Sequence, residues 1–163
     1  MRSTKDQQKA EAERELFRKF AEAMSWPSRL DKIQNSEPPQ PDILFLGLDS
    51  PVAFELAEIC ASDVAEQRAK LLKTGGVSVI WTFDPTEEIL LSKLGKNYVT
   101  EHPIELLCYM NGRVVSPDSQ VEAQIAATLS ASNKNDFRRI WYFGEHKIFE
   151  FSPSGKLLNT TEL

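Results

Sequence analysis

Cysteine and histidine are scarce in this chain. Cys60, Cys108, His102 and His146 are the only residues of these types among 163, and no CxxC pair or Cys/His cluster occurs. A structural zinc site needs a tetrahedral set of such ligands, so none is expected. The two cysteines are expected to be reduced, buried small residues. Both histidines are expected at the surface, because no serine or cysteine nucleophile pattern accompanies them.

Long apolar runs are also missing. The longest, such as Ile43 to Leu46, are far too short to span a bilayer. The opening residues MRSTKDQQKAEAERE contain no apolar stretch of the kind that a signal peptide needs. The sequence therefore predicts a cytoplasmic protein with no membrane association.

Common catalytic motifs are absent as well. No GxSxG, Walker A or GxGxxG string occurs, which argues against the common hydrolase, nucleotide-triphosphatase and dinucleotide-binding classes. The net charge of −5 gives no long-range attraction to nucleic acid, so a general DNA-coating protein is not expected. A nuclease with a local basic face remains compatible with a negative total charge.

What is present suits one globular α/β domain. Hydrophobic residues make up 41% of the chain, enough to build a core. Apolar periodicity and turn residues predict helices over 5–24, 61–74, 85–94 and 118–130, and strands over 29–34, 42–47, 52–59, 77–83, 104–110, 137–143 and 147–151. A tight turn at 48–51 joins two of these strands into a hairpin. Hairpins beside helical connections imply a central mixed sheet flanked by helices.

Two acids mark the predicted hairpin. Asp42 follows Pro41 at the start of one strand, and Glu55 lies within the apolar return strand Val-Ala-Phe-Glu-Leu-Ala. A carboxylate in such a strand is costly to bury unless it is paired or binds a metal. Acids on neighbouring strands can share a divalent cation, and Mg²⁺ accepts one or two carboxylates together with water. Ordinary turn chemistry at Asp42 and an edge position for Glu55 are the alternatives.

Pro41-Asp42, the hairpin and Glu55 together resemble the PD-(D/E)XK nuclease superfamily. The element order from residue 5 to 83, α-β-β-β-α-β, is similar to the core of that superfamily. The resemblance implies a restriction-endonuclease-like core over 11–83, with residues 1–10 frayed and 84–163 forming an α/β extension of the same sheet. It also implies Mg²⁺ or Mn²⁺ bound by Asp42 and Glu55, and a further acid from the first helix: Glu13, Glu15 or Glu22.

The sequence departs from this superfamily at one position. The catalytic lysine stands two residues after the glutamate in the superfamily, whereas this chain has Ala57. Some members carry the lysine on the following helix, where Lys70 is the first candidate and Lys73 the second. Glu58 faces away from Glu55 on an extended strand and is expected to be a solvated acid.

Two function classes follow. In the first, Asp42, Glu55 and Lys70 serve a divalent-metal-dependent nuclease that acts on DNA or RNA. In the second, the scaffold has lost catalysis and binds protein or nucleic acid through its C-terminal extension. Arg138 and Arg139, beside Trp141 and Tyr142, suit phosphate contact and base stacking, but equally suit an amphipathic strand with exposed arginines.

Overall fold

The computed structural model describes residues 3–59, 85–110, 116–133 and 135–163. Within these ranges seven strands form one mixed sheet in the order β1 to β7, with helices on both faces. The elements are α1 (Thr4–Ala23), the 3-10 turn η1 (Leu30–Lys32), β1 (Ile33–Asn35), β2 (Ile43–Phe45), β3 (Val52–Ile59), α3 (Thr86–Leu94), β4 (Ile104–Met110), α4 (Asp118–Ala131), β5 (Phe137–Phe143), β6 (Lys147–Phe151) and β7 (Leu157–Glu162). The predicted α/β class with a central mixed sheet is confirmed.

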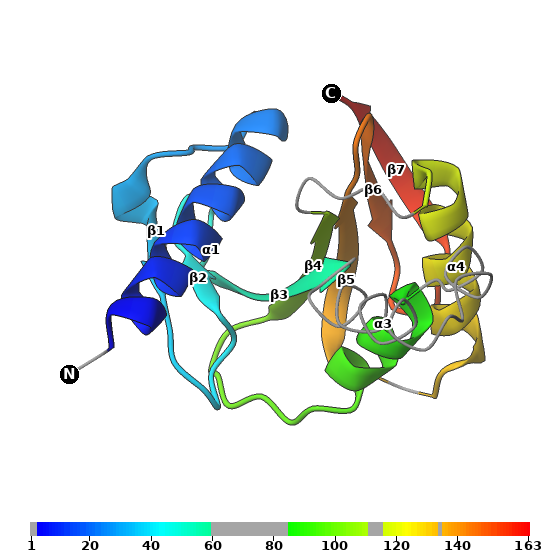
Figure 1. Ribbon diagram of the computed structural model, residues 1–163, viewed down its shortest axis with the longest axis horizontal. Helices are drawn as coiled ribbons and strands as arrows, with labels where there is room; N and C mark the ends of the chain where they lie inside the picture. The colour runs from blue at the N-terminus through cyan, green and yellow to red at the C-terminus, as the bar shows by residue number, and fades with distance from the viewer. Residues whose placement is uncertain (1–2, 60–84, 111–115, 134) are drawn as a thin grey trace, which may run out of the picture.

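The strand directions divide the sheet into three parts. The first three strands run antiparallel, β3, β4 and β5 are parallel to one another, and β5 to β7 are again antiparallel. Figure 1 shows β3 passing from the β1–β2 side of the molecule to the side where α3 and α4 lie. The predicted helix 61–74 and strand 77–83 lie outside the described residues.

The hairpin predicted across residues 48–51 is confirmed. β2 pairs with β3 in the register Ile43 to Phe54 and Phe45 to Val52. β2 is much shorter than β3 and its first residue, Ile43, pairs with Phe54, so the second half of β3 extends beyond the start of β2. That half pairs with β4 on its other edge.

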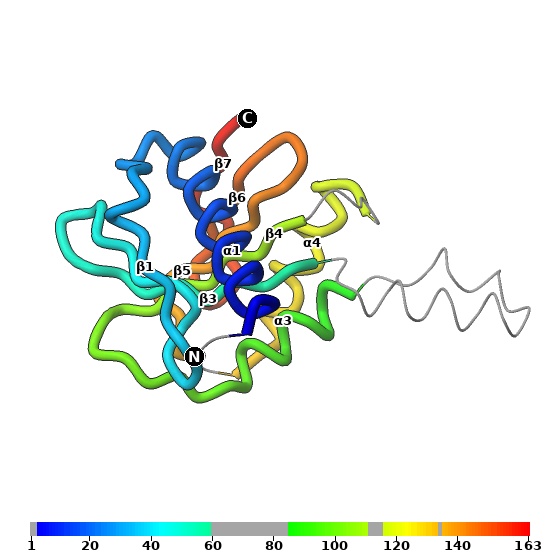
Figure 2. The backbone as a smooth tube through the Cα atoms, turned by 60° about the vertical axis from the view of Figure 1, so that its left-hand side comes forward, coloured from blue at the N-terminus to red at the C-terminus, as the bar shows by residue number. Residues whose placement is uncertain are grey.

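The two faces of the sheet carry separate cores. On one face α1 contributes Phe17 and Phe20, which pack on Phe45, Phe54 and other buried residues of the sheet. The Phe17 and Phe54 rings lie 4.7 Å apart between centroids. Figure 2 is turned so that α1 comes toward the reader over this face. On the opposite face α3 and α4 pack on alternate residues of the same strands, Ala57 and Ile59 among them.

Two details differ from the sequence-based expectation. The strand predicted over 29–34 was wrong for most of its length, since residues 30–32 form a 3-10 turn and β1 begins only at Ile33. Arg14 of α1 explains this turn, because its guanidinium donates to the carbonyl oxygens of Leu30 and Ile33. The helix predicted over 5–24 is confirmed as α1, which begins with a capping box between Ser3 and Asp6.

The second difference is β7, which was not predicted. Its sequence, LLNTTE, lacks a regular apolar alternation, and most of its residues are exposed at the edge of the sheet. Among the described residues, no helix is long and apolar enough to cross a membrane.

Candidate active site

Asp42 and Glu55 face each other across the β2–β3 hairpin. Continuing the register from Ile43 and Phe54 by one residue on each strand places Asp42 opposite Glu55. Asp42 itself lies just before β2, and its negative charge raises the pKa of Glu55, so the two carboxylates are near each other. Asp42 Oδ2 also accepts a hydrogen bond from the backbone nitrogen of Leu56 at 2.9 Å. This bond holds the Asp42 carboxylate against β3 just before β2 begins.

Glu55 is one of the few buried acids of the described residues. It is 5% exposed, and its Oε1 lies 2.7 Å from the Nζ of Lys93. Burial is the main cause that raises the pKa of Glu55, and the negative charge of Asp42 raises this pKa further. Lys93 and, more weakly, Lys96 oppose that shift. The Glu55 carboxylate is therefore a group that a nearby cation stabilises in its charged form.

Lys93 is the basic residue that the sequence-based prediction missed. It belongs to the last turn of α3, where a lysine also suits the helix dipole. Packing of α3 against β3 brings it to Glu55 across 38 residues of sequence. The predicted Lys70 and its alternative Lys73 lie outside the described residues. The prediction that a lysine of the helix over 61–74 reaches the acidic pair is therefore not tested, and Lys93 reaches Glu55 from a later helix.

Ala57 has no room for the lysine that the PD-(D/E)XK pattern would place there. Its side chain is 1% exposed and belongs to the core that includes Ile59, Leu90 and Cys108. A lysine at this position would have to place an ammonium group in an apolar layer. The local packing therefore accounts for alanine at position 57 and requires any cation of the site to come from elsewhere.

The structure distinguishes among the three acids proposed from the first helix. Glu13 lines the same cleft as Asp42, and its pKa is raised by burial first and then by the charges of Asp42 and Glu55. Glu15 and Glu22 instead form ion pairs with Arg18 on the outer side of α1. The sequence contained this signal, because Glu13 precedes the buried Phe17 by one helical turn.

Two tyrosines border the acids. The Tyr98 hydroxyl donates to the carbonyl oxygen of Lys93 at 3.2 Å. Burial raises the pKa of Tyr98, and the charges of Glu55 and Asp42 raise it further. Burial also raises the pKa of Tyr109, with additional contributions from the charges of Glu58 and Glu13. Both phenols therefore remain neutral donors beside the carboxylates.

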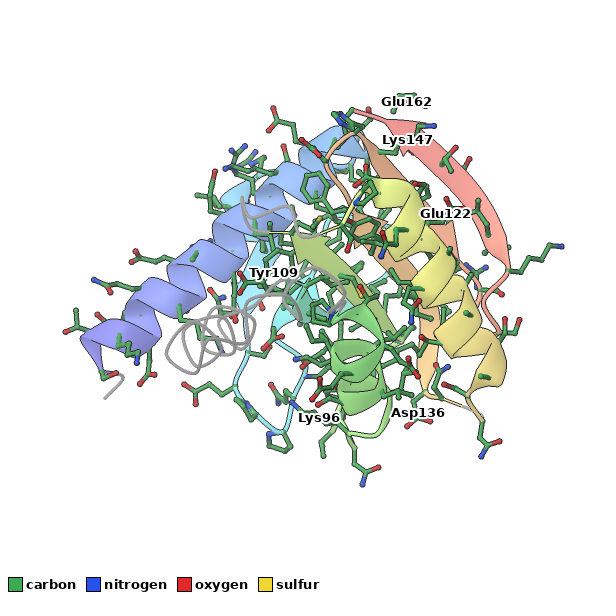
Figure 3. All side chains as sticks on the ribbon, turned by 45° about the vertical axis from the view of Figure 1, so that its right-hand side comes forward. Lys96, Tyr109, Glu122, Asp136, Lys147 and Glu162 are labelled. Atoms are coloured by element: carbon green, nitrogen blue, oxygen red, sulfur yellow. The ribbon has the colours of Figure 1, made fainter. Side chains whose placement is uncertain are left out.

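The acids lie where two clefts meet. One cleft of about 380 Å³ and another of about 360 Å³ share Lys9, Asp42 and Lys93 in their linings. Figure 3 labels one residue of each cleft: Tyr109, from β4, belongs to the first, and Lys96, just after α3, belongs to the second. The site is thus a groove along the part of β3 that extends past β2, between α1 and α3.

The donor set fits a hard divalent cation that retains water ligands. Within the described ranges, no group of three or more His, Cys, Asp or Glu side chains forms a ready metal cage. Asp42 and Glu55 supply carboxylate oxygens, and Mg²⁺ commonly binds through one or two carboxylates with water and phosphate completing the shell. The pair therefore suits Mg²⁺ or Mn²⁺ bound together with a substrate.

The C-terminal aromatic and basic residues have other partners. Arg138 donates to Glu105 Oε1 from Nε at 3.0 Å and from Nη2 at 2.8 Å, and Trp141 Nε1 donates to Glu105 Oε2 at 2.8 Å. Arg139 pairs with Glu150. Trp141 and Tyr142 are buried, so they do not present ring faces for base stacking. The amphipathic-strand interpretation accounts for these residues.

The remaining predicted positions are peripheral. His146 is exposed, as expected, whereas His102 is half-buried and its backbone nitrogen donates to Thr100 Oγ1. Cys108 is a free, buried cysteine whose pKa burial raises to about 12, as expected for an inert thiol. Cys60 lies outside the described residues. Glu58 is half-buried rather than fully solvated, and it lines the larger cleft.

Comparison with known proteins adds no family assignment. No family model matches the chain, and no significant match was found among curated proteins or solved structures.

Proposed function

We propose that this protein is a divalent-metal-dependent nuclease that acts on phosphodiester bonds of DNA or RNA, built on a restriction-endonuclease-like core. In this proposal Asp42 and Glu55 hold Mg²⁺ or Mn²⁺. Lys93 takes the role that the sequence suggested for Lys70, and Glu13 is the acid contributed by the first helix.

One observation carries the proposal. A buried carboxylate, Glu55, lies opposite Asp42 on a neighbouring strand and bonds to Lys93 at 2.7 Å within a solvent-open groove. Acids with perturbed pKa values beside a lysine in a cleft are typical of catalytic sites. Burying Glu55 costs folding free energy that an apolar residue at the same position would not cost.

The order of strands supports the same proposal. A helix, three antiparallel strands and then a parallel strand next to β3 occur in α1, β1, β2, β3 and β4. The resemblance implies the same helix followed by three strands over residues 5–59, whereas the helix and strand that it places next, over 61–74 and 77–83, lie outside the described residues. Such a resemblance of fold does not itself establish an activity, so the functional argument depends on the acids and Lys93.

The chemistry divides among the side chains. A bound divalent cation would polarise the scissile phosphate and lower the pKa of a water molecule. Asp42, held by the Leu56 amide, keeps its carboxylate in place before substrate binds. Lys93 is close enough to Glu55 to balance its charge and to donate to a phosphate oxygen or to the attacking water. Tyr98 helps to hold Lys93 in place, because its hydroxyl donates to the backbone carbonyl oxygen of Lys93.

A non-catalytic interaction module is the second candidate. The observation that favours it is the direct ion pair, because Lys93 already neutralises Glu55 without a metal. An active site that has lost catalysis would also retain such a charge-neutral ion pair as a structural contact. The C-terminal extension would then provide the binding surface for protein or nucleic acid.

Cleavage assays separate these candidates. We expect purified protein with millimolar Mn²⁺ to cleave labelled single- or double-stranded oligonucleotides of DNA or RNA. Glu55→Gln and Lys93→Met should each reduce the rate by at least about 100-fold, a typical loss for a group that stabilises the transition state. Glu11→Gln and Lys156→Met are matched controls at exposed positions and should cleave like wild type. Equal rates in all five proteins, or no cleavage of any substrate, would favour the interaction module.

A further inference from the structure

The two clefts that meet at the acids differ in charge. Apart from the residues that they share, the larger cleft is lined by three acids and by no basic residue within the described ranges: Glu13, Glu58 and Glu88. The smaller cleft has Lys96, Asn97 and Gln40 beside the paired Glu55. We name the first set the acidic mouth and the second set the lysine mouth.

The lysine mouth suits a phosphodiester backbone. Lys96, Asn97 and Gln40 are all exposed, so their donors are available to a ligand. Lysine ammonium and side-chain amides are common donors to phosphate oxygens. The positive charge of Lys96 also acts on Glu55, which places this lysine near the proposed reaction centre. A phosphate next to the scissile one would therefore find donors at this mouth.

The acidic mouth does not suit a phosphodiester backbone. Glu88 is exposed, Glu58 is half-buried, and both line the groove beyond Asp42. Lys9, which lines both clefts, pairs with Glu13 at 3.5 Å and so offsets only part of the negative charge of the acidic mouth. A nucleic-acid strand that continued through this mouth would bring its phosphates against carboxylates.

We infer that the substrate strand enters from the lysine mouth and does not continue through the acidic mouth, so that the protein removes nucleotides from strand ends. This inference rests on the proposed nuclease function and specifies its substrate as a single strand with a free terminus. Lys96 is then a specificity-determining residue, because it binds the phosphate on the side of the strand that remains bound. Glu58 and Glu88 repel the phosphates of a strand that would have to pass through the acidic mouth, and so exclude strands that have no free terminus.

Linear and circular single-stranded DNA of the same sequence test the requirement for an end. With Mn²⁺ we expect the linear form to be degraded at least tenfold faster than the circular form. The double variant Glu58→Gln/Glu88→Gln should bring the ratio of the linear to the circular degradation rate closer to one. Degradation of both forms at equal rates by wild type would overturn the inference and leave the nuclease proposal intact. Degradation of neither form would instead count against the nuclease function itself.

Binding of a fluorescent oligothymidylate tests the lysine mouth independently of cleavage. The measurements use the Glu55→Gln variant as background and follow the dissociation constant as a function of salt. Adding Lys96→Gln should weaken binding several-fold and reduce the salt slope by about 0.7, the value for one lost phosphate contact on a single strand. Adding Lys156→Gln, at an exposed lysine that lines neither cleft, should change neither quantity. An oligonucleotide that does not bind, or that binds equally with and without Lys96, would overturn the inference.

Discussion

Lys93 Nζ lies 2.7 Å from Glu55 Oε1, and this ion pair joins the last turn of α3 to the middle of β3. The Glu55 side chain is 7% exposed and that of Lys93 is 19% exposed, so water screens the pair only weakly. Removing one member of such a pair leaves the other charge without compensation in a poorly solvated place. The pair is therefore the contact through which stability and the proposed catalysis are coupled.

Lys93→Met should destabilise the protein in a pH-dependent way. The pKa of Glu55 is already raised above its ordinary value of 4.5, and Lys93 is the main influence that limits the rise. An acid whose pKa is higher in the folded state stabilises the fold below its unfolded pKa, and this stabilisation is lost as the pH rises through the folded pKa. Without Lys93 the folded pKa rises further, so the loss extends to higher pH.

We therefore expect Lys93→Met to be nearly as stable as wild type at about pH 4 and about 2–3 kcal/mol less stable at pH 7, as measured by urea unfolding. Adding Glu55→Gln to Lys93→Met should remove most of the deficit at pH 7, because the uncompensated charge is gone. A deficit that stays constant between these pH values would show that Lys93 acts through packing rather than through Glu55.

Ala57→Lys should not substitute for Lys93. Position 57 is buried in the core beneath α3, and a lysine there would have to displace apolar neighbours or bury its charge. We expect a loss of about 3 kcal/mol or more in unfolding free energy. Ala123→Lys, at an exposed position of α4, is the matched control and should change stability by less than about 0.5 kcal/mol.

The catalytic consequence is equally testable. The double variant Ala57→Lys/Lys93→Met should cleave no faster than Lys93→Met alone at a temperature where both are folded. Recovery of cleavage in the double variant would show that position 57 can reach the acids, in contradiction to its buried position.

The sequence was sufficient to predict the hairpin and most strands. The strand predicted over 104–110 and the pair predicted over 137–143 and 147–151 match β4, β5 and β6 residue for residue. These segments are short runs rich in apolar residues and bounded by turn residues, which is a local signal. β7 lacked this signal, because a mostly polar strand at a sheet edge is stabilised by its partner β6 and not by its own pattern.

Only the part of the site that is local in sequence, Asp42 and Glu55, was predictable. Asp42 and Glu55 are brought together by a tight hairpin, so their proximity follows from a short stretch of sequence. Lys93 was not predictable in this way, because only the packing of α3 on β3 brings it to Glu55. Glu105 was also missed, since nothing in its own strand shows that Arg138 and Trp141 would be its partners.

Arg138→Met should lower stability without affecting nucleic-acid binding. Its guanidinium compensates the buried Glu105, but 46% of the Arg138 side chain is exposed, so part of the interaction is screened. We expect a loss of about 1–3 kcal/mol in unfolding free energy at pH 7. The salt slope for oligonucleotide binding should stay unchanged, because this arginine already has a protein partner.

Arg29→Met is the control for this variant. Arg29 pairs with Asp31 at the surface, and its side chain is 80% exposed, so its loss should cost little stability. A lower salt slope in Arg138→Met would instead revive the interpretation that this strand contacts phosphate.

Binding of Mn²⁺ should stabilise the folded protein through Glu55. A cation that binds only the folded state adds about 2.7 kcal/mol at a concentration one hundred times its dissociation constant. We expect millimolar Mn²⁺ to raise the melting temperature of wild type and of Glu11→Gln, whose substitution lies at an exposed position of α1. Lys93→Met should retain or increase this response, because Lys93 competes with the metal for Glu55 Oε1.

Glu55→Gln should lose most of the Mn²⁺ response, because an amide oxygen is a weaker ligand than a carboxylate. Without metal we expect no gain in stability from Glu55→Gln. The substitution removes repulsion from Asp42, but it also removes the attraction to Lys93. Differential scanning calorimetry at several Mn²⁺ concentrations measures both effects. An unchanged melting temperature in wild type, or equal shifts in wild type and Glu55→Gln, would mean that these acids do not form a metal site. The ion pair between Glu55 and Lys93 would then be a structural contact only.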